Sequence, residues 1–192
     1  MELYKDIPIF LFETPKEFEN WLNKNHHAFS AVWIKFAKKK SGAVSISYDE
    51  ALEVAICYGW IDGLLNKFDE KYYVVRFTPR KKQSIWSKVN KNTVGRLIKE
   101  GKMKPSGLEA IENAKANGRW EAAYDSSATM QLPDDFLTEL AKDKKAEEFF
   151  KTLTRANTYA IAFRLQTATR PETRAKRMKE LLEMLKRGEK LH

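Results

Sequence analysis

The segment between Arg76 and Lys104 has the residue types from which an anion-binding site can be built. It holds ten Lys or Arg residues and one acid, Glu100, so its charge of +9 equals that of the whole 192-residue chain. Guanidinium groups bind phosphate or carboxylate through two parallel hydrogen bonds, hydroxyls donate further bonds, and free N–H groups at a helix start attract anions. The sequence therefore predicts that this segment binds negative charge.

Nine residues in and beside this segment are the candidate ligand-binding residues. They are Trp60, Asp62, Arg80, Lys81, Lys82, Ser84, Trp86, Ser87 and Asn90. Asp62 lies between two glycines, where its carboxylate could accept a hydrogen bond from Arg80 or cap a turn. A plainer interpretation makes the segment a basic surface loop, in which Ser87 only caps a helix and Trp86 belongs to the core.

Three classes of function fit these residues. The first is a non-catalytic binding protein whose partner is an anionic small molecule or an acidic protein surface. The second is an enzyme acting on a phosphorylated or carboxylated small molecule, with Asp62 as acid or base. The third is a nucleic-acid binder that adds a second basic segment, residues 155–192, with ten cations against four acids. We favour the first class and rank the third last, because the sequence has no recognised nucleic-acid-binding signature. The sequence does not indicate an oligomeric state.

The sequence gives little support to metal, cofactor or disulfide chemistry. His26, His27 and His192 lack Cys, Asp or Glu neighbours at metal-ligand spacing, and the common phosphate-loop, dinucleotide and nucleophile-elbow motifs are missing. We expect no metal and no cofactor. The one cysteine, Cys57, lies in an apolar run, which is typical of a buried thiol in a reducing compartment. No secretory signal or long apolar run is present, so we expect a cytoplasmic location without a transmembrane span.

The spacing of apolar residues predicts an α+β fold, a small antiparallel sheet packed by helices and followed by a helical C-terminal lobe. Residues 31–38 and 71–79 alternate as half-buried strands, while Trp60–Gly63 is expected to form a tight connection. Capping signals predict helices from Pro15 to Asn25 and from Ser47 to Gly59. Further helices are expected after Ser87, from Pro105, and at residues 133–141, 144–153, 155–166 and 171–187.

These elements predict two regions joined by a linker. Residues 1–120 form the α+β domain, and residues 132–192 form the helical C-terminal region. The intervening residues 121–131 are polar and show little periodicity, which is typical of a linker. We expect the two regions to pack together as one unit.

Several short motifs, in a shared order and spacing, resemble those of a known bacterial family. They are Ala51-Leu52, Tyr58–Gly63, Phe77–Lys81, Ser84, Trp86, Ser87, Asn90, Arg96–Ile98, Gly101–Met103, Ala114-Lys115, Gly118–Trp120 and Glu172–Arg177. Spanning residues 14 to 187, this set is similar to the bacteriocin-protection family, also described as YdeI or OmpD-associated. The resemblance implies an intracellular bacterial protein linked to envelope stress, to tolerance of bacteriocins or antimicrobial peptides, and to porin function. It supplies no reaction and no catalytic residues.

Overall fold

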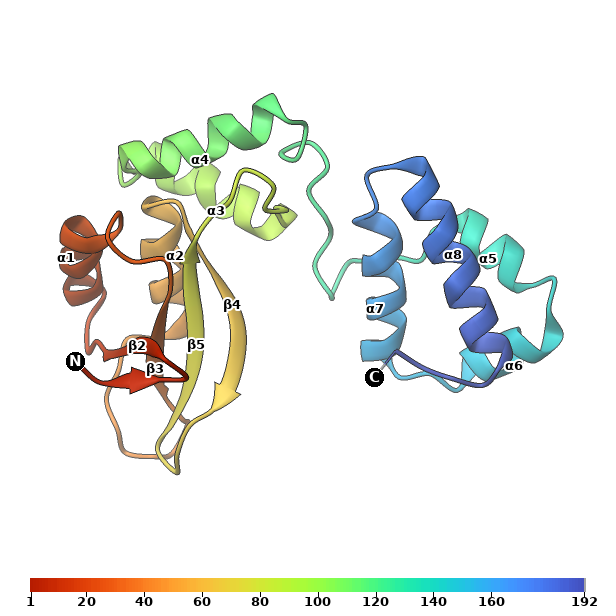
Figure 1. The fold of residues 1–192 in the computed structure, drawn as a ribbon, viewed down its shortest axis with the longest axis horizontal. Coiled ribbons are helices and arrows are strands. Elements are labelled where there is room, and N and C mark those ends of the chain that lie inside the picture. Colours follow the sequence, from red (N-terminus) through yellow and green to blue (C-terminus); the bar gives the residue numbers. More distant parts are fainter. Residues whose placement is uncertain (192) are drawn as a thin grey trace. The chain divides into compact units, whose positions relative to one another are not determined.

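The computed structural model describes residues 1–191 and divides the chain into two compact units (Figure 1). The first unit comprises Met1–Ser84 and Lys91–Trp120, and the second comprises Ile85–Asn90 and Glu121–His192. His192 itself, one of the three histidines considered above, lies outside the described residues.

A five-stranded sheet with the order β1-β2-β3-β5-β4 forms the centre of the first unit. Its strands are β1 (Leu3–Tyr4), β2 (Ile7–Leu11), β3 (Val32–Ala37), β4 (Trp60–Lys67) and β5 (Tyr72–Pro79). The predicted α+β class is confirmed, with one difference: β2 and β3 run parallel, whereas the other pairs are antiparallel. The sheet is mixed because helix α1 (Pro15–Asn25) connects β2 to β3, and parallel neighbours require such a crossover.

Helices α1 and α2 (Tyr48–Cys57) supply aromatic side chains to one face of this sheet (Figure 1). On β3, every second residue points to this face, and Val32, Ile34 and Phe36 are at most 1% exposed. The Phe18 ring of α1 packs edge-on against Phe77 of β5, with ring centroids 6.0 Å apart. The sheet and these two helices therefore share one aromatic-rich core.

The opposite face of the sheet is also covered near β1. Trp33, which alternates with the residues above, is 2% exposed and packs with Ile9 and Val74. The Tyr4 ring lies edge-on to the Trp33 indole at a centroid distance of 5.2 Å. The short β1–β2 hairpin thus shields an indole that would otherwise face water.

Local capping groups set the helix starts. Thr14 Oγ1 accepts a hydrogen bond from the Glu17 amide at the start of α1. At the start of α2, Ser47 and Glu50 form the expected capping box, in which each side chain accepts from the other residue's backbone amide. These contacts explain why both helices begin where the sequence predicts.

Helices α3 (Lys88–Lys99) and α4 (Pro105–Ala116) follow β5, and α4 packs closely on the end of α2. The Lys104 amide donates to the carbonyl oxygen of Cys57 at 3.0 Å. A Cβ atom on Gly107 would lie 2.2 Å from that same oxygen, so only glycine fits there. Gly59, with φ of +73°, reverses the chain after α2, and a Cβ there would lie 2.7 Å from the Ser106 carbonyl oxygen.

The second unit is helical. It contains α5 (Asp134–Leu140), α6 (Lys144–Lys151), α7 (Arg155–Gln166) and α8 (Pro171–Lys186), each within one or two residues of its predicted range. Their buried core consists of Phe136, Leu140, Ala146, Ile161, Leu165, Leu181 and Leu185. Asp143 and Thr154 cap α6 and α7 through their side chains. This unit therefore has a hydrophobic core of its own.

One prediction for the first unit was wrong. Residues 60–63 do not form a tight connection; they begin strand β4, which pairs with β5 from Trp60 opposite Pro79 to Lys67 opposite Tyr73. Gly59 alone makes the turn, and Gly63 lies at an irregularity in the β4–β5 register. Within residues 1–191, none of the helices combines the length and the hydropathy that a membrane span requires.

Candidate anion-binding site

The ends of β4 and β5 bring two of the motifs together. Trp60 pairs with Pro79 in the ladder, and the Arg80 amide donates to the Gly59 carbonyl oxygen at 2.8 Å. Because Gly59 has already reversed the chain after α2, the segment that leaves β5 starts beside the end of that helix. The backbone at Arg80 is therefore held by the end of the sheet.

Residues Arg80–Ser84 form a turn, which we call the basic turn. The Ser84 amide donates to the Lys81 carbonyl at 2.9 Å, and the Lys81 amide donates to Ser84 Oγ at 3.0 Å. From the end of α4, the Asn117 side-chain amide donates to the Lys82 carbonyl at 2.6 Å. Three hydrogen bonds thus hold this turn, while the Lys81 and Lys82 side chains remain exposed.

The cations of the basic segment differ in their partners. Arg96, Lys102 and Lys104 each pair with a carboxylate, as does Lys88 of the second unit. By contrast, Arg76, Lys81 and Lys82 have no acidic partner anywhere in residues 1–191. Three uncompensated cations therefore lie within seven residues of chain at the end of β5.

Arg76 also contributes a buried hydrogen-bond donor to this part of the molecule. It lies opposite Trp33 in the β3–β5 ladder, on the sheet face away from α1 and α2. Its Nε and the indole Nε1 of Trp33 are both buried, and neither has a hydrogen-bond acceptor in the described part of the chain. A buried donor without an acceptor costs about 1–3 kcal/mol, so an acceptor supplied from outside would be favourable here.

Trp60 and Asp62 face the core and not the basic turn. Trp60 is 1% exposed, and its indole packs edge-on against Trp21 of α1 at 6.2 Å. Asp62, on the same face of β4, accepts from the Tyr48 hydroxyl at 2.6 Å. Burial, and then this hydrogen bond, raise the pKa of Tyr48, so the phenol stays protonated as the donor. The geometry therefore gives Asp62 a bond to α2, which is neither the bond to Arg80 nor the turn cap that the sequence left open.

Trp86, Ser87 and Asn90 belong to the second unit and have structural contacts there. Trp86 is 2% exposed. Ser87 Oγ accepts from the Asn90 amide at 3.1 Å, which is the geometry of a helix cap at the start of α3. Ser87 also bridges to Tyr124, whose carbonyl accepts from the Lys88 amide at 2.8 Å. These contacts match the plainer interpretation, in which Ser87 caps and Trp86 is core.

Two residues of the site had no sequence signal. Trp33 alternates with core residues on an apolar strand, and nothing in that pattern marks its indole nitrogen as unpartnered. Asn117, at the end of α4, anchors Lys82 across 35 residues of chain. Such contacts depend on how α4 packs, which local patterns do not report.

Comparison with protein families divides the chain in two. Residues 10–110, more than half of its length, match a domain of unknown function (DUF8412). Residues 129–188 match the family described as bacteriocin-protection, YdeI or OmpD-associated. The chain therefore belongs to the family of the domain of unknown function, and its C-terminal third contains a match to the bacteriocin-protection family. Comparison with curated proteins and with solved structures gives no match.

The two matches fall on different parts of the fold. The bacteriocin-protection match covers α5 to α8, and it contains the Glu172–Arg177 motif that the sequence shares with this family. The match to the domain of unknown function contains strands β3, β4 and β5, the basic turn and Arg76. This match confirms the resemblance for residues 129–188 and supports, at family level, a role in bacteriocin protection. Most of the motifs between Ala51 and Trp120 fall instead in the match to the domain of unknown function. It names no ligand for the basic turn.

Proposed function

We propose that this chain is a non-catalytic protein of a bacterial stress response, which binds an anionic ligand or an acidic protein surface through the basic turn. One observation carries the proposal: Arg76, Lys81 and Lys82 have no acidic partner within residues 1–191, whereas Arg96, Lys102 and Lys104 of the same segment do. Unpaired like charges repel, and a bound anion would relieve that repulsion.

The basic turn is held in place before any ligand arrives. Its backbone is fixed by bonds from Ser84, Asn117 and the sheet, so binding need not order it. Preorganisation of this kind lowers the entropic cost of binding. Arg80, Lys81, Lys82 and Ser84 are thus the predicted residues that we retain as ligand-binding.

Arg76 extends this site along the sheet. It precedes Arg80 by four residues, which spans about 13 Å of extended strand. One phosphate ion cannot contact both ends of such a site, whereas an acidic peptide segment can. A small anion should therefore engage the turn alone, and a longer polyanion should engage Arg76 as well.

We also propose a cytoplasmic location. The chain's one cysteine, Cys57, is buried and has no disulfide partner, which fits a reducing compartment. Catalysis by Asp62 would need its carboxylate near the basic turn. We do not adopt that function, because the Asp62 carboxylate is bonded to Tyr48 on the helix-covered face.

The test removes the two turn lysines and compares them with a matched pair. Lys81→Gln/Lys82→Gln should weaken binding of inorganic phosphate and of poly-L-glutamate about tenfold at low ionic strength, the effect of two exposed charges. Lys39→Gln/Lys40→Gln is the control, since these lysines are also adjacent, exposed and without an acidic partner in residues 1–191. Calorimetric titration measures both. Equal losses in the two variants, or no binding by the unmodified protein, would contradict the proposal.

A further inference from the structure

The first unit also contains a cavity that is unrelated to the basic turn. It has a volume of about 410 Å³ and is lined by residues of α1, α2 and α3 together with the adjoining Tyr58 and Lys102. None of the nine residues predicted to bind a ligand lines it. Pockets of roughly 300–1,000 Å³ are the size that small organic molecules occupy in proteins.

The floor of this cavity is apolar and already packed. Cys57, Tyr58 and Leu97 line it, and they are 6%, 4% and 1% exposed. Burial raises the pKa of the Cys57 thiol to about 11, so the sulfur is uncharged at neutral pH and acts as an apolar contact. A ligand with an apolar body would find these contacts without reorganising the core.

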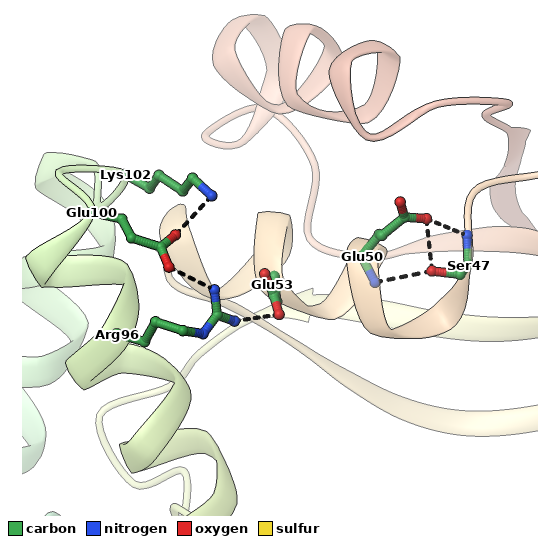
Figure 2. A network of polar contacts seen from close by, with 6 residues as sticks. All are labelled: Ser47, Glu50, Glu53, Arg96, Glu100 and Lys102. Atoms are coloured by element: carbon green, nitrogen blue, oxygen red, sulfur yellow. Dashed lines mark hydrogen bonds and ion pairs between the residues drawn. The ribbon is translucent and has the colours of Figure 1, made fainter.

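Most charges on the rim are satisfied by each other. Glu19 accepts from Lys16 at 3.0 Å and from Lys104 at 3.1 Å. Arg96 bridges Glu53 and Glu100, and Lys102 lies 2.7 Å from the other oxygen of Glu100 (Figure 2). These charges form two sets of ion pairs, so they are poorly available to a ligand.

Glu50 is the exception on the rim. Its Oε2 accepts from the amide and the hydroxyl of Ser47, at 3.0 and 2.7 Å, and both donors are neutral. No cation in residues 1–191 pairs with this carboxylate, and in Figure 2 its other oxygen contacts none of the residues drawn. The Ser47 hydrogen bonds lower the pKa of Glu50, so it is ionised at neutral pH. The rim thus presents one carboxylate that lacks a counter-charge.

From the cavity and this carboxylate together, we propose that the cavity binds a small amphipathic amine, with its apolar body on the Cys57–Leu97 floor and its ammonium group at Glu50. A carboxylate ligand would bring a second negative charge beside Glu50 and would find the rim lysines already paired. A neutral apolar molecule would fit the floor but would leave Glu50 uncompensated. Charge complementarity therefore selects the cation.

The test compares three probes that share one body: 2-phenylethylamine, 2-phenylethanol and 3-phenylpropionate. In Glu50→Gln the capping box persists, because glutamine can also bond the Ser47 amide, while the charge is removed. We expect this variant to bind the amine about tenfold more weakly and the alcohol unchanged. Glu109→Gln, an exposed acid outside the cavity, is the control and should bind all three probes as the unmodified protein does.

Cys57 gives an independent reading of occupancy, since it is the only cysteine in the chain. The amine should slow the reaction of this thiol with methyl methanethiosulfonate, and Val54→Phe, which fills the floor, should abolish the protection. Three results would overturn the proposal: no amine binding at about 10 mM, equal binding of amine and carboxylate, or an amine affinity insensitive to Glu50→Gln. Phosphate binding at the basic turn should be the same in all these variants, so the two proposals can fail separately.

Discussion

The basic turn and the cavity rim, both in the first unit, differ in how their charges are partnered. On the rim, seven charged groups form two sets of ion pairs, and Glu50 alone lacks a counter-charge within residues 1–191. At the end of β5 the balance is the reverse: Arg76, Lys81 and Lys82 have no acidic partner within residues 1–191, and no carboxylate lies among them in the sequence. The sequence is rich in charged residues at both places, and the two places differ in whether those residues have partners of opposite charge.

This difference shows where charge is informative about function. Exposed ion pairs contribute about 0–1 kcal/mol each, so the paired rim says little about stability or binding. A group without a partner, held in place by backbone contacts, is a better indicator of a binding site. By that criterion the basic turn should attract anions and the rim should attract a cation at Glu50.

The largest expected effect comes from a substitution at the junction of α2 and α4. Gly107→Ala would place a Cβ 2.2 Å from the Cys57 carbonyl oxygen, so the backbone must shift. We expect the free energy of unfolding to fall by about 3 kcal/mol. Gly95→Ala, in α3 with nothing within 4 Å, is the control and should raise it by up to about 1 kcal/mol. Urea denaturation measures both, and similar midpoints for the two variants would disprove this account of the junction.

The apolar floor of the cavity predicts a loss of stability at high pH. Because burial raises the pKa of Cys57 to about 11, the folded state holds the thiol proton more tightly than the unfolded state does. This stabilisation is complete below the unfolded pKa, near 8.5, and is lost as pH rises through 11, by about 2–3 kcal/mol. In Cys57→Ala that part of the pH dependence should disappear. If the two proteins differ in stability by the same amount at pH 8 and pH 11.5, the thiol is not the cause.

Local signals predict much of this fold. The capping box at Ser47 and Glu50, the prolines at the starts of α1, α4 and α8, and the alternation in β3 each involve a few neighbouring residues. Because such signals act within one turn of helix or a few strand positions, they can be recognised without tertiary structure. The helices of the second unit follow from the same reasoning.

Long-range strand pairing accounts for the features of the fold that local sequence patterns did not predict. Gly59 and Gly63 made residues 60–63 resemble a turn, but the ladder with β5 turns them into a strand. The parallel pairing of β2 with β3 likewise depends on how α1 packs on the sheet. Neither pairing leaves a local signature, since strand partners are chosen by the whole core.

The candidate site was predictable only in part, for a similar reason. The sequence indicates that cations gather after β5, but not which of them acquire carboxylate partners. Asp62 bonds Tyr48 rather than Arg80, and Asn117 secures the turn from 35 residues away. Partner assignment needs the tertiary fold, and it is this assignment that separates the basic turn from the cavity rim.

Arg76 offers a sharper test of the extended anion site. Arg76→Gln removes a cation on the sheet face while leaving the basic turn intact. We expect the affinity for poly-L-glutamate to fall about fivefold and the affinity for inorganic phosphate to stay within error, because only the longer anion reaches this position. Equal losses for the two probes would mean that the site is compact and that Arg76 belongs to the turn.

The smallest expected effect tests whether ion pairing keeps the rim carboxylates from attracting a ligand. Arg96→Gln removes the cation that bridges Glu53 and Glu100, and since that arginine is exposed, the stability should change little. Glu53 lies one helical turn from Glu50 on α2 and also lines the cavity, so its freed carboxylate would add a second unpaired charge there. We therefore expect 2-phenylethylamine to bind about threefold more tightly to this variant, whereas 2-phenylethanol should be unaffected. If the amine affinity does not rise, ion pairing does not control how strongly the rim carboxylates attract the amine. The difference in pairing between the rim and the basic turn would then not explain which ligand the cavity binds.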